Sequence, residues 1–143
     1  MIIKTRHTGL VVKNINESIK FYEGLGLHVW KHENEKGDFL SQVVGLNNAE
    51  IETAKMKVAD GSLLELLEYK SHPTNSADSN YPSNFHGCSH VAFTVMDIED
   101  TASKILKLGG SVVNPAAVSD NGLVKVMYCH DLDGILMEIV QEL

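Results

Sequence analysis

Arginine is almost absent from this chain of 143 residues: Arg6 is the single example, and the formal net charge is −7. Nucleic-acid binding needs clustered lysine and arginine side chains to neutralise phosphates, and the sequence contains no such cluster. We therefore expect no nucleic-acid partner. The same shortage argues against a heavily anionic substrate held by arginine side chains.

Cysteine and long apolar runs are also scarce. The two cysteines, Cys88 and Cys129, are too few for a disulfide framework, which predicts a reducing, cytoplasmic location. No apolar run approaches the roughly 20 residues that cross a bilayer, so we expect no membrane association. The length, and a hydrophobic share of 43%, are typical of one soluble globular domain.

What the sequence does contain is an internal repeat. At an offset of 83 residues, the segment His7–Val12 aligns with His90–Val95, and the alignment continues through the residues that follow. At an offset of 73 residues, the segment around Glu65 aligns with the segment around Glu138. The repeat therefore makes His7 and Glu65 the equivalents of His90 and Glu138.

Each copy of the repeat predicts the element order βαβββ from its hydrophobic periodicity. In the first copy we expect a strand at 5–12, a helix at 14–23 capped by Asn14 or Asn16, and strands at 27–30, 51–58 and 63–68. In the second copy we expect a strand at 90–95, a helix from 98 to 108 capped by Asp97, and strands at 111–113, 124–129 and 135–140. Asp60-Gly61 and Asp133-Gly134 each predict a tight hairpin turn. The predicted fold class is α+β, built from tandem βαβββ modules.

Two stretches break this symmetry. Residues 71–87 are rich in Ser, Asn and Pro and are predicted to link internal modules 1–70 and 88–143 within a single domain, 1–143. Residues 31–48 form a connection ten residues longer than its counterpart, 114–121, and contain several apolar side chains. Long connections in compact domains are usually functional, so residues 31–48 form either a lid over a pocket or part of an oligomer interface.

The repeated histidines and glutamates predict a metal site. Each glutamate is flanked at two-residue spacing by apolar residues, and a carboxylate on the buried side of a strand is costly unless its charge is compensated. No lysine or arginine repeats alongside either glutamate, whereas one divalent cation would compensate both. A single strand histidine is more often a hydrogen-bonded core residue, and a single glutamate near a hairpin is more often solvated. Their joint repetition favours metal ligation by His7, Glu65, His90 and Glu138.

The motifs that surround these residues form a recognisable set. They are His7–Val12, Ser18–Tyr22, Gly24–Leu27, Leu64–Leu66, His90–Phe93 and Asp131–Gly134 leading to Glu138. In these segments, which span nearly the whole chain, the sequence resembles the vicinal oxygen chelate superfamily. That superfamily includes glyoxalase I, methylmalonyl-CoA epimerase, fosfomycin thiol transferases, extradiol ring-cleaving dioxygenases and bleomycin-resistance proteins. The resemblance implies a curled eight-stranded mixed sheet around a metal site, usually in a dimer.

The resemblance also implies a site and a reaction. His7, Glu65, His90 and Glu138 match the four metal-ligand positions of the superfamily, for one divalent ion such as Zn, Ni, Co, Mn or Fe. Glutamate at both paired positions is similar to glyoxalase I, a lactoylglutathione lyase, and to some epimerases. The implied reaction is proton abstraction next to a carbonyl, through a metal-chelated enediolate, with Glu138 or Glu65 as the general base.

The substrate implied is a small molecule with adjacent oxygens. The arginine usual on the first strand of glyoxalase I is absent here, where the chain has Gly9–Val12, so the use of glutathione or another thiol stays open. Two alternatives also remain. An extradiol ring-cleaving dioxygenase would need ferrous iron and would consume oxygen, whereas a metal-free protein similar to bleomycin-resistance proteins would bind a ligand without chemistry.

Overall fold

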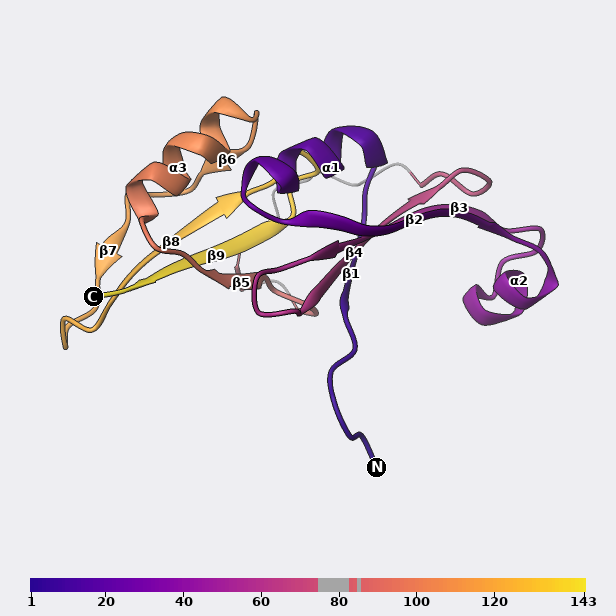
Figure 1. Cartoon of the computed structure of the whole chain (residues 1–143), viewed down its shortest axis with the longest axis horizontal. Coiled ribbons are helices and arrows are strands. Elements are labelled where there is room, and N and C mark those ends of the chain that lie inside the picture. Colours follow the sequence, from indigo (N-terminus) through magenta and orange to yellow (C-terminus); the bar gives the residue numbers. More distant parts are fainter. Residues whose placement is uncertain (75–82, 85) are drawn as a thin grey trace. The chain divides into compact units, whose positions relative to one another are not determined.

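The computed structural model describes residues 1–74, 83–84 and 86–143 and contains, within them, three helices and nine strands (Figure 1). The chain divides into two compact units, Met1–Ser76 and Ala77–Leu143. Part of the predicted linker, residues 75–82 and 85, lies outside the described residues. In the described ranges, no helix has both the length and the apolar character needed to span a membrane.

The first unit is a four-stranded sheet with two helices. Its elements are β1 (Thr8–Val11), α1 (Ile15–Gly24), β2 (His28–Lys36), α2 (Asp38–Val44), β3 (Glu50–Lys57) and β4 (Leu63–Tyr69). The strand order is β1-β4-β3-β2, in which β1 runs parallel to β4 and the other pairs are antiparallel. Helix α1 lies along one face of this sheet (Figure 1) and buries Ile15, Ile19 and Tyr22.

The second unit repeats this plan with one addition. Its elements are β5 (Val91–Thr94), α3 (Ile98–Lys107), β6 (Ser111–Val112), β7 (Ala117–Val118), β8 (Val124–His130) and β9 (Leu136–Glu142). The strand order is β5-β9-β8-β6, with β5 parallel to β9, and β7 also pairs with β8. The predicted α+β class and the repeated order of elements are confirmed. The strands belong to two sheets, of four and five strands, and β7 is a short strand that the periodicity did not predict.

Both long helices begin at the predicted capping residues. The side chain of Asn14, rather than that of Asn16, accepts hydrogen bonds at the start of α1, from the backbone N–H groups of Asn16 and Glu17. The side chain of Asp97 accepts one from the backbone N–H of Asp100 at the start of α3. These side-chain acceptors satisfy N–H groups that lack a partner inside the helix, so the two helices start at equivalent positions of the repeat.

The longer connection of the first unit extends the sheet and adds a helix. Strand β2 continues through Lys36, and α2 follows it. Leu40 packs in a buried cluster with Ala49 and Ile51, against which Leu67 and Tyr69 also pack. The start of α1 contacts Glu68, and Glu68 alternates along β4 with Leu67 and Tyr69, so its side chain lies on the other face of the sheet. Helix α2 therefore packs on the opposite face of the sheet from α1. The lid and the oligomer interface both stay predictions for this segment.

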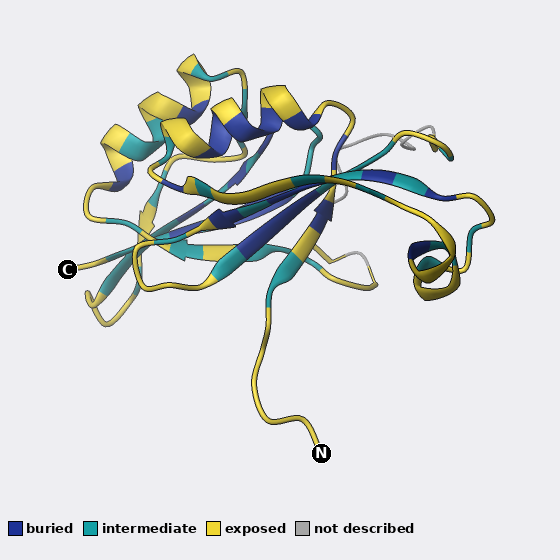
Figure 2. Cartoon of the chain, turned by 45° about the vertical axis from the view of Figure 1, so that its right-hand side comes forward, coloured by how far each residue is buried: buried dark blue, intermediate teal, exposed yellow. Residues whose placement is uncertain are grey.

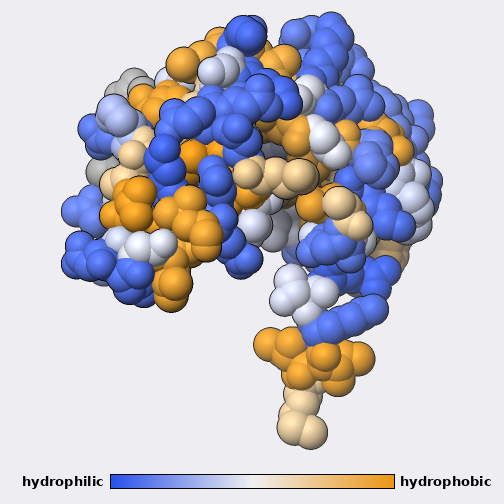
Figure 3. Space-filling view, turned by 60° about the vertical axis from the view of Figure 1, so that its left-hand side comes forward, coloured by the Kyte–Doolittle hydropathy of each residue, from blue (hydrophilic) through white to orange (hydrophobic). Residues whose placement is uncertain are grey.

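The N-terminal strand is shorter than predicted. Strand β1 begins at Thr8, and the preceding residues extend away from the sheet (Figure 1). Met1, Ile2 and Ile3 are exposed, and they form the apolar end of the chain at the bottom of Figure 3. The apolar core lies instead along the strands and on the helix faces turned toward them (Figure 2).

Candidate metal centre

The first unit brings His7 and Glu65 together. The parallel pairing of β1 with β4 sets Gly9 opposite Glu65, and His7 precedes Gly9 by two positions on the same face. The His7 Nε2 atom lies 3.0 Å from the Glu65 Oε2 atom. Glu65 is buried, with 11% of its side chain exposed.

The second unit repeats this pair. Strand β5 is parallel to β9 and sets Ala92 opposite Glu138, while His90 precedes Ala92 by two positions. The His90 Nε2 atom lies 2.9 Å from the Glu138 Oε2 atom, and 26% of the Glu138 side chain is exposed. The structure thus joins the four predicted residues as two equivalent pairs, one in each unit. That the two pairs ligate one ion stays a prediction.

Each pair has donor atoms of the kinds that a divalent ion binds, an imidazole nitrogen and a carboxylate oxygen. Two ligand atoms in neighbouring positions of an octahedral ion, each bound at about 2.1 Å, lie about 3.0 Å apart. The nitrogen–oxygen distances of 3.0 Å and 2.9 Å are compatible with this spacing and are equally those of a direct hydrogen bond, so the donor types and not the distances favour an ion. Among all the described residues, no group of three or more His, Cys, Asp or Glu side chains that could hold an ion is present. One unit therefore supplies a pair of ligands rather than a complete set.

No cation is repeated alongside the two glutamates, as the sequence indicated, but Glu65 has a lysine partner that the repeat did not reveal. The Lys55 Nζ atom lies 3.3 Å from the Glu65 Oε1 atom, and 24% of the Lys55 side chain is exposed. Lys55 stands opposite Glu65 in the antiparallel register of β3 and β4. Counting outward from a two-residue Asp60-Gly61 turn would have set Met56 opposite Glu65. The observed loop has three residues between Val58 and Ser62, and this shifts the register by one residue.

Tyr128 takes the place of Lys55 in the second unit. It stands opposite Glu138 in the register of β8 and β9, ten residues before the glutamate as Lys55 is before Glu65. Its ring lies edge-on to the His90 ring, with ring centroids 5.3 Å apart. Glu65 therefore has a histidine and a lysine as ion-pair partners, whereas the histidine His90 is the ion-pair partner of Glu138 in the described structure.

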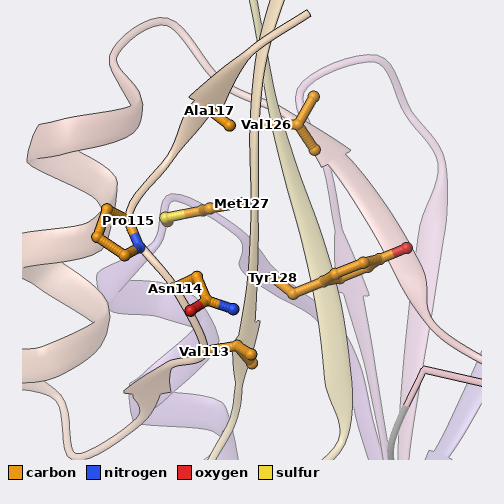
Figure 4. A pocket seen from close by; sticks show the side chains of 7 residues that line it. All are labelled: Val113, Asn114, Pro115, Ala117, Val126, Met127 and Tyr128. Atoms are coloured by element: carbon orange, nitrogen blue, oxygen red, sulfur yellow. The ribbon is translucent and has the colours of Figure 1, made fainter.

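A pocket adjoins the second pair through Tyr128. It occupies the gap where the chain between β6 and β7 leaves the edge of β8 (Figure 4), and its volume is about 270 Å³. The lining consists of Val113, Asn114, Pro115, Ala117, Val126, Met127 and Tyr128. None of these side chains is charged.

A further histidine–glutamate pair lies elsewhere in the first unit. His32 Nε2 is 2.8 Å from Glu52 Oε1, and Lys70 Nζ is 2.8 Å from Glu52 Oε2. The hydrogen bond from Lys70 is the main cause that lowers the pKa of Glu52 below its usual value. Glu52 alternates with Lys55 along β3 and faces the other side of the sheet, and its equivalent in the second unit is Lys125. This pair is not repeated.

The two cysteines are both free thiols. Cys88 is exposed, whereas Cys129 is buried in β8. Burial raises the pKa of the Cys129 thiol to about 12, because the interior disfavours the thiolate. Cys129 is therefore a structural residue of the core.

Comparison with known proteins identifies the family. The sequence profile of the Glyoxalase/Bleomycin resistance protein/Dioxygenase superfamily matches residues 4–139. The chain belongs to this superfamily. A glyoxalase family protein from Bacillus cereus has a similar structure, with a TM-score of 0.92 and 29% sequence identity over 100% of this chain and 96% of that one.

Two sequence relatives of this glyoxalase-superfamily chain carry more specific names. A probable lactoylglutathione lyase from Synechocystis is 27% identical over 137 residues, which cover 94% of this chain and 92% of the relative. A lactoylglutathione lyase from Neisseria meningitidis serogroup A is 27% identical over 138 residues, which cover 95% and 88%. The similarity thus extends over nearly the full length of each protein.

Proposed function

We propose that this chain is a metal-dependent lyase or isomerase of the glyoxalase type, which transfers a proton between carbons next to a carbonyl. The observation that carries the proposal is the repeated histidine–glutamate pair, at 3.0 Å in one unit and 2.9 Å in the other. His7, Glu65, His90 and Glu138 would together hold one divalent ion, of which Zn, Ni, Co, Mn and Fe all suit two nitrogen and two oxygen ligands. Relatives named lactoylglutathione lyase support this reaction class.

When bound, the ion would polarise the substrate carbonyl and stabilise the negative charge that develops on its oxygen. Glu138 is the general base: its carboxylate takes a proton from the carbon next to the carbonyl and delivers it to the neighbouring carbon. Glu138 is preferred to Glu65 because its side chain is more exposed and has fewer ion-pair partners. Glu65, held by His7 and Lys55, stays fixed.

The substrate in this proposal is a small molecule with adjacent oxygens. Arg6 is the single arginine, so this chain lacks the side chains for a bidentate arginine clamp on each carboxylate of glutathione. If the reaction uses a cosubstrate thiol, that thiol is therefore not glutathione held by an arginine at each of its two carboxylates. In this proposal the enzyme acts as a homodimer in the cytoplasm.

Metal stoichiometry tests the proposal directly. The purified protein is stripped with a chelator, reconstituted with Co²⁺ and measured by elemental analysis. We expect about one ion per chain in the wild type, and loss of the ion from both Glu65→Ala and His90→Ala, because each removes one ligand from a different unit.

A matched control comes from the pair that is not repeated. The variant His32→Ala removes a histidine that lies 2.8 Å from a glutamate but belongs to the other face of the sheet. It should retain the full cobalt content. Cobalt that stays bound in Glu65→Ala and His90→Ala, or that is absent from the wild type, would contradict the four-residue centre. Oxygen consumption with a catechol would favour ring cleavage instead.

A further inference from the structure

The pocket beside Tyr128 has a composition that selects its occupant. Five of its lining residues are apolar, namely Val113, Pro115, Ala117, Val126 and Met127. The polar groups among the lining side chains are the amide of Asn114 and the hydroxyl of Tyr128. No lining side chain offers an ionic partner to a charged group, and the mostly apolar lining favours an apolar group.

The size of the pocket limits the occupant further. Its volume of about 270 Å³ exceeds the roughly 150 Å³ of an apolar cavity that holds one benzene molecule. It lies below the range of roughly 300–1,000 Å³ that is typical of sites for whole drug-sized ligands. The pocket therefore suits one ring or one branched alkyl group rather than an entire tripeptide.

The position of the pocket connects it to the candidate metal centre. Tyr128 lines the pocket and also contacts the His90 ring, and it stands opposite Glu138 in the sheet. Met127 and Tyr128 project to opposite sides of β8 (Figure 4), so the pocket borders the side of the strand that carries Glu138. A molecule whose oxygens lie beside His90 and Glu138 would thus have its neighbouring substituent within reach of the pocket.

We propose that this pocket is the subsite for a compact, uncharged aryl or branched alkyl group attached next to the paired oxygens of the substrate. This inference rests on the proposed function, because it assumes that the substrate oxygens bind beside His90 and Glu138. The substrate class becomes an α-oxygenated carbonyl compound with an apolar substituent. The apolar substituent supplies binding free energy, and the oxygen pair supplies orientation.

Two hydroxamates test the inference on the cobalt-loaded protein. Benzohydroxamate and acetohydroxamate both present adjacent oxygens, but only the first carries a ring. We expect benzohydroxamate to bind about tenfold more tightly or better, after correction for the affinities of the two compounds for free Co²⁺, since burial of a ring contributes roughly 1.5–3 kcal/mol. The cobalt absorption spectrum reports binding without any requirement for turnover.

One variant closes the pocket, and a neighbouring one serves as its control. Ala117→Leu adds a side chain to the lining and should abolish the preference while leaving the affinity for acetohydroxamate unchanged. Val118→Leu adds one carbon at the next residue, which is exposed and does not line the pocket, and it should retain the preference.

The outcomes separate this inference from the proposed function. Equal affinities in the wild type, or a preference that survives in Ala117→Leu, would overturn the subsite while leaving the metal centre in place. An altered molecular mass of Ala117→Leu in analytical ultracentrifugation would show that the pocket is an interface between copies and would also overturn the subsite. Failure of the protein to bind Co²⁺ would refute the proposed function itself.

Discussion

The backbone N–H of Ile15 donates a hydrogen bond of 2.8 Å to the Oε2 atom of Glu68, which joins the first residue of α1 to the end of β4. The second unit has the equivalent hydrogen bond with an amide in place of the carboxylate: the N–H of Ile98 donates to the Oε1 atom of Gln141 at 2.9 Å. A carbonyl-type oxygen at this position of the last strand therefore fixes the start of the helix in both units.

The Gln141 contact predicts how Glu68 responds to substitution. Glu68→Gln should leave stability nearly unchanged, because an amide oxygen already accepts the equivalent hydrogen bond in the second unit. Glu68→Ala leaves the Ile15 N–H without this acceptor and should lower the free energy of unfolding by about 1 kcal/mol. Urea unfolding of the three proteins measures the difference. Equal losses in both variants would show that the ion pair with Lys70, and not the hydrogen bond, carries the effect.

The ion pair of Glu52 with Lys70 predicts a dependence of stability on pH. Hydrogen bonding from Lys70 lowers the pKa of Glu52 below its ordinary value of 4.5 in the folded state. A depressed carboxyl pKa stabilises the folded state above the unfolded value, and this contribution is lost as the pH falls through the folded value. The stability difference between wild type and Glu52→Gln should therefore be largest above pH 4.5 and disappear in more acidic solution.

An exposed pair provides the comparison for this pH effect. Glu17 and Lys20 are 2.9 Å apart on α1, with 55% and 69% of their side chains exposed. Exposed pairs of this kind contribute little because water and salt screen them. Glu17→Gln should therefore differ little from the wild type at any pH in the same urea titration. A pH-independent deficit in Glu52→Gln would argue against the ion pair as its cause.

The assignment of the general base predicts a difference between the two glutamates. Glu138→Gln should retain bound metal, because an amide oxygen can still ligate, but should lower turnover at least about 100-fold, the lower range of general-base contributions. Deuterium uptake from D₂O into the product or recovered substrate should fall in parallel. Glu65→Gln should lower the affinity for cobalt, because in the proposal Glu65 is a fixed ligand and not the general base. Wild-type turnover by Glu138→Gln on the true substrate would remove Glu138 from the mechanism.

The contrast between the two cysteines predicts thiol reactivity. At pH 8 the exposed Cys88 should react with a disulfide reagent such as DTNB, whereas Cys129 should not, since burial raises its pKa to about 12. We expect about one reactive thiol per folded chain and two after unfolding. Cys88→Ser should abolish the reaction of the folded protein. Two reactive thiols in the folded wild type would show that β8 opens readily.

Much of the fold could be predicted because the same hydrophobic periodicity occurs in both copies of the repeat. The helices begin where Asn14 and Asp97 were expected, and the strands next to both Asp-Gly turns lie within two residues of their predicted limits. The extension of β2 through Lys36 was not predicted, because its alternating charged residues lie at an exposed sheet edge where apolar periodicity is weak. Strand β7, with two residues, is too short to show periodicity at all.

The candidate site was predicted less completely than the fold. The repeat identified His7, Glu65, His90 and Glu138, and the structure adds that each histidine lies against the glutamate of its own unit, because the two strands that carry them pair in parallel. That the four residues ligate one ion stays a prediction. Lys55 was missed because its nearness to Glu65 depends on cross-strand register, and no lysine stands at the equivalent position of the second copy, where Tyr128 does. Repetition identifies what the two units share and says little about where they differ.

The parallel pairing of β1 with β4, and of β5 with β9, also bears on how the protein folds. The hairpins β3–β4 and β8–β9 join neighbouring stretches of chain, whereas His7 meets Glu65 only after the intervening elements of the unit have been enclosed. Contacts between distant parts of a chain form later than local ones, because the entropy of closing the loop must be lost first. An incompletely folded unit would therefore present its carboxylate without its imidazole, so the histidine–glutamate pair of each unit is a property of the finished structure.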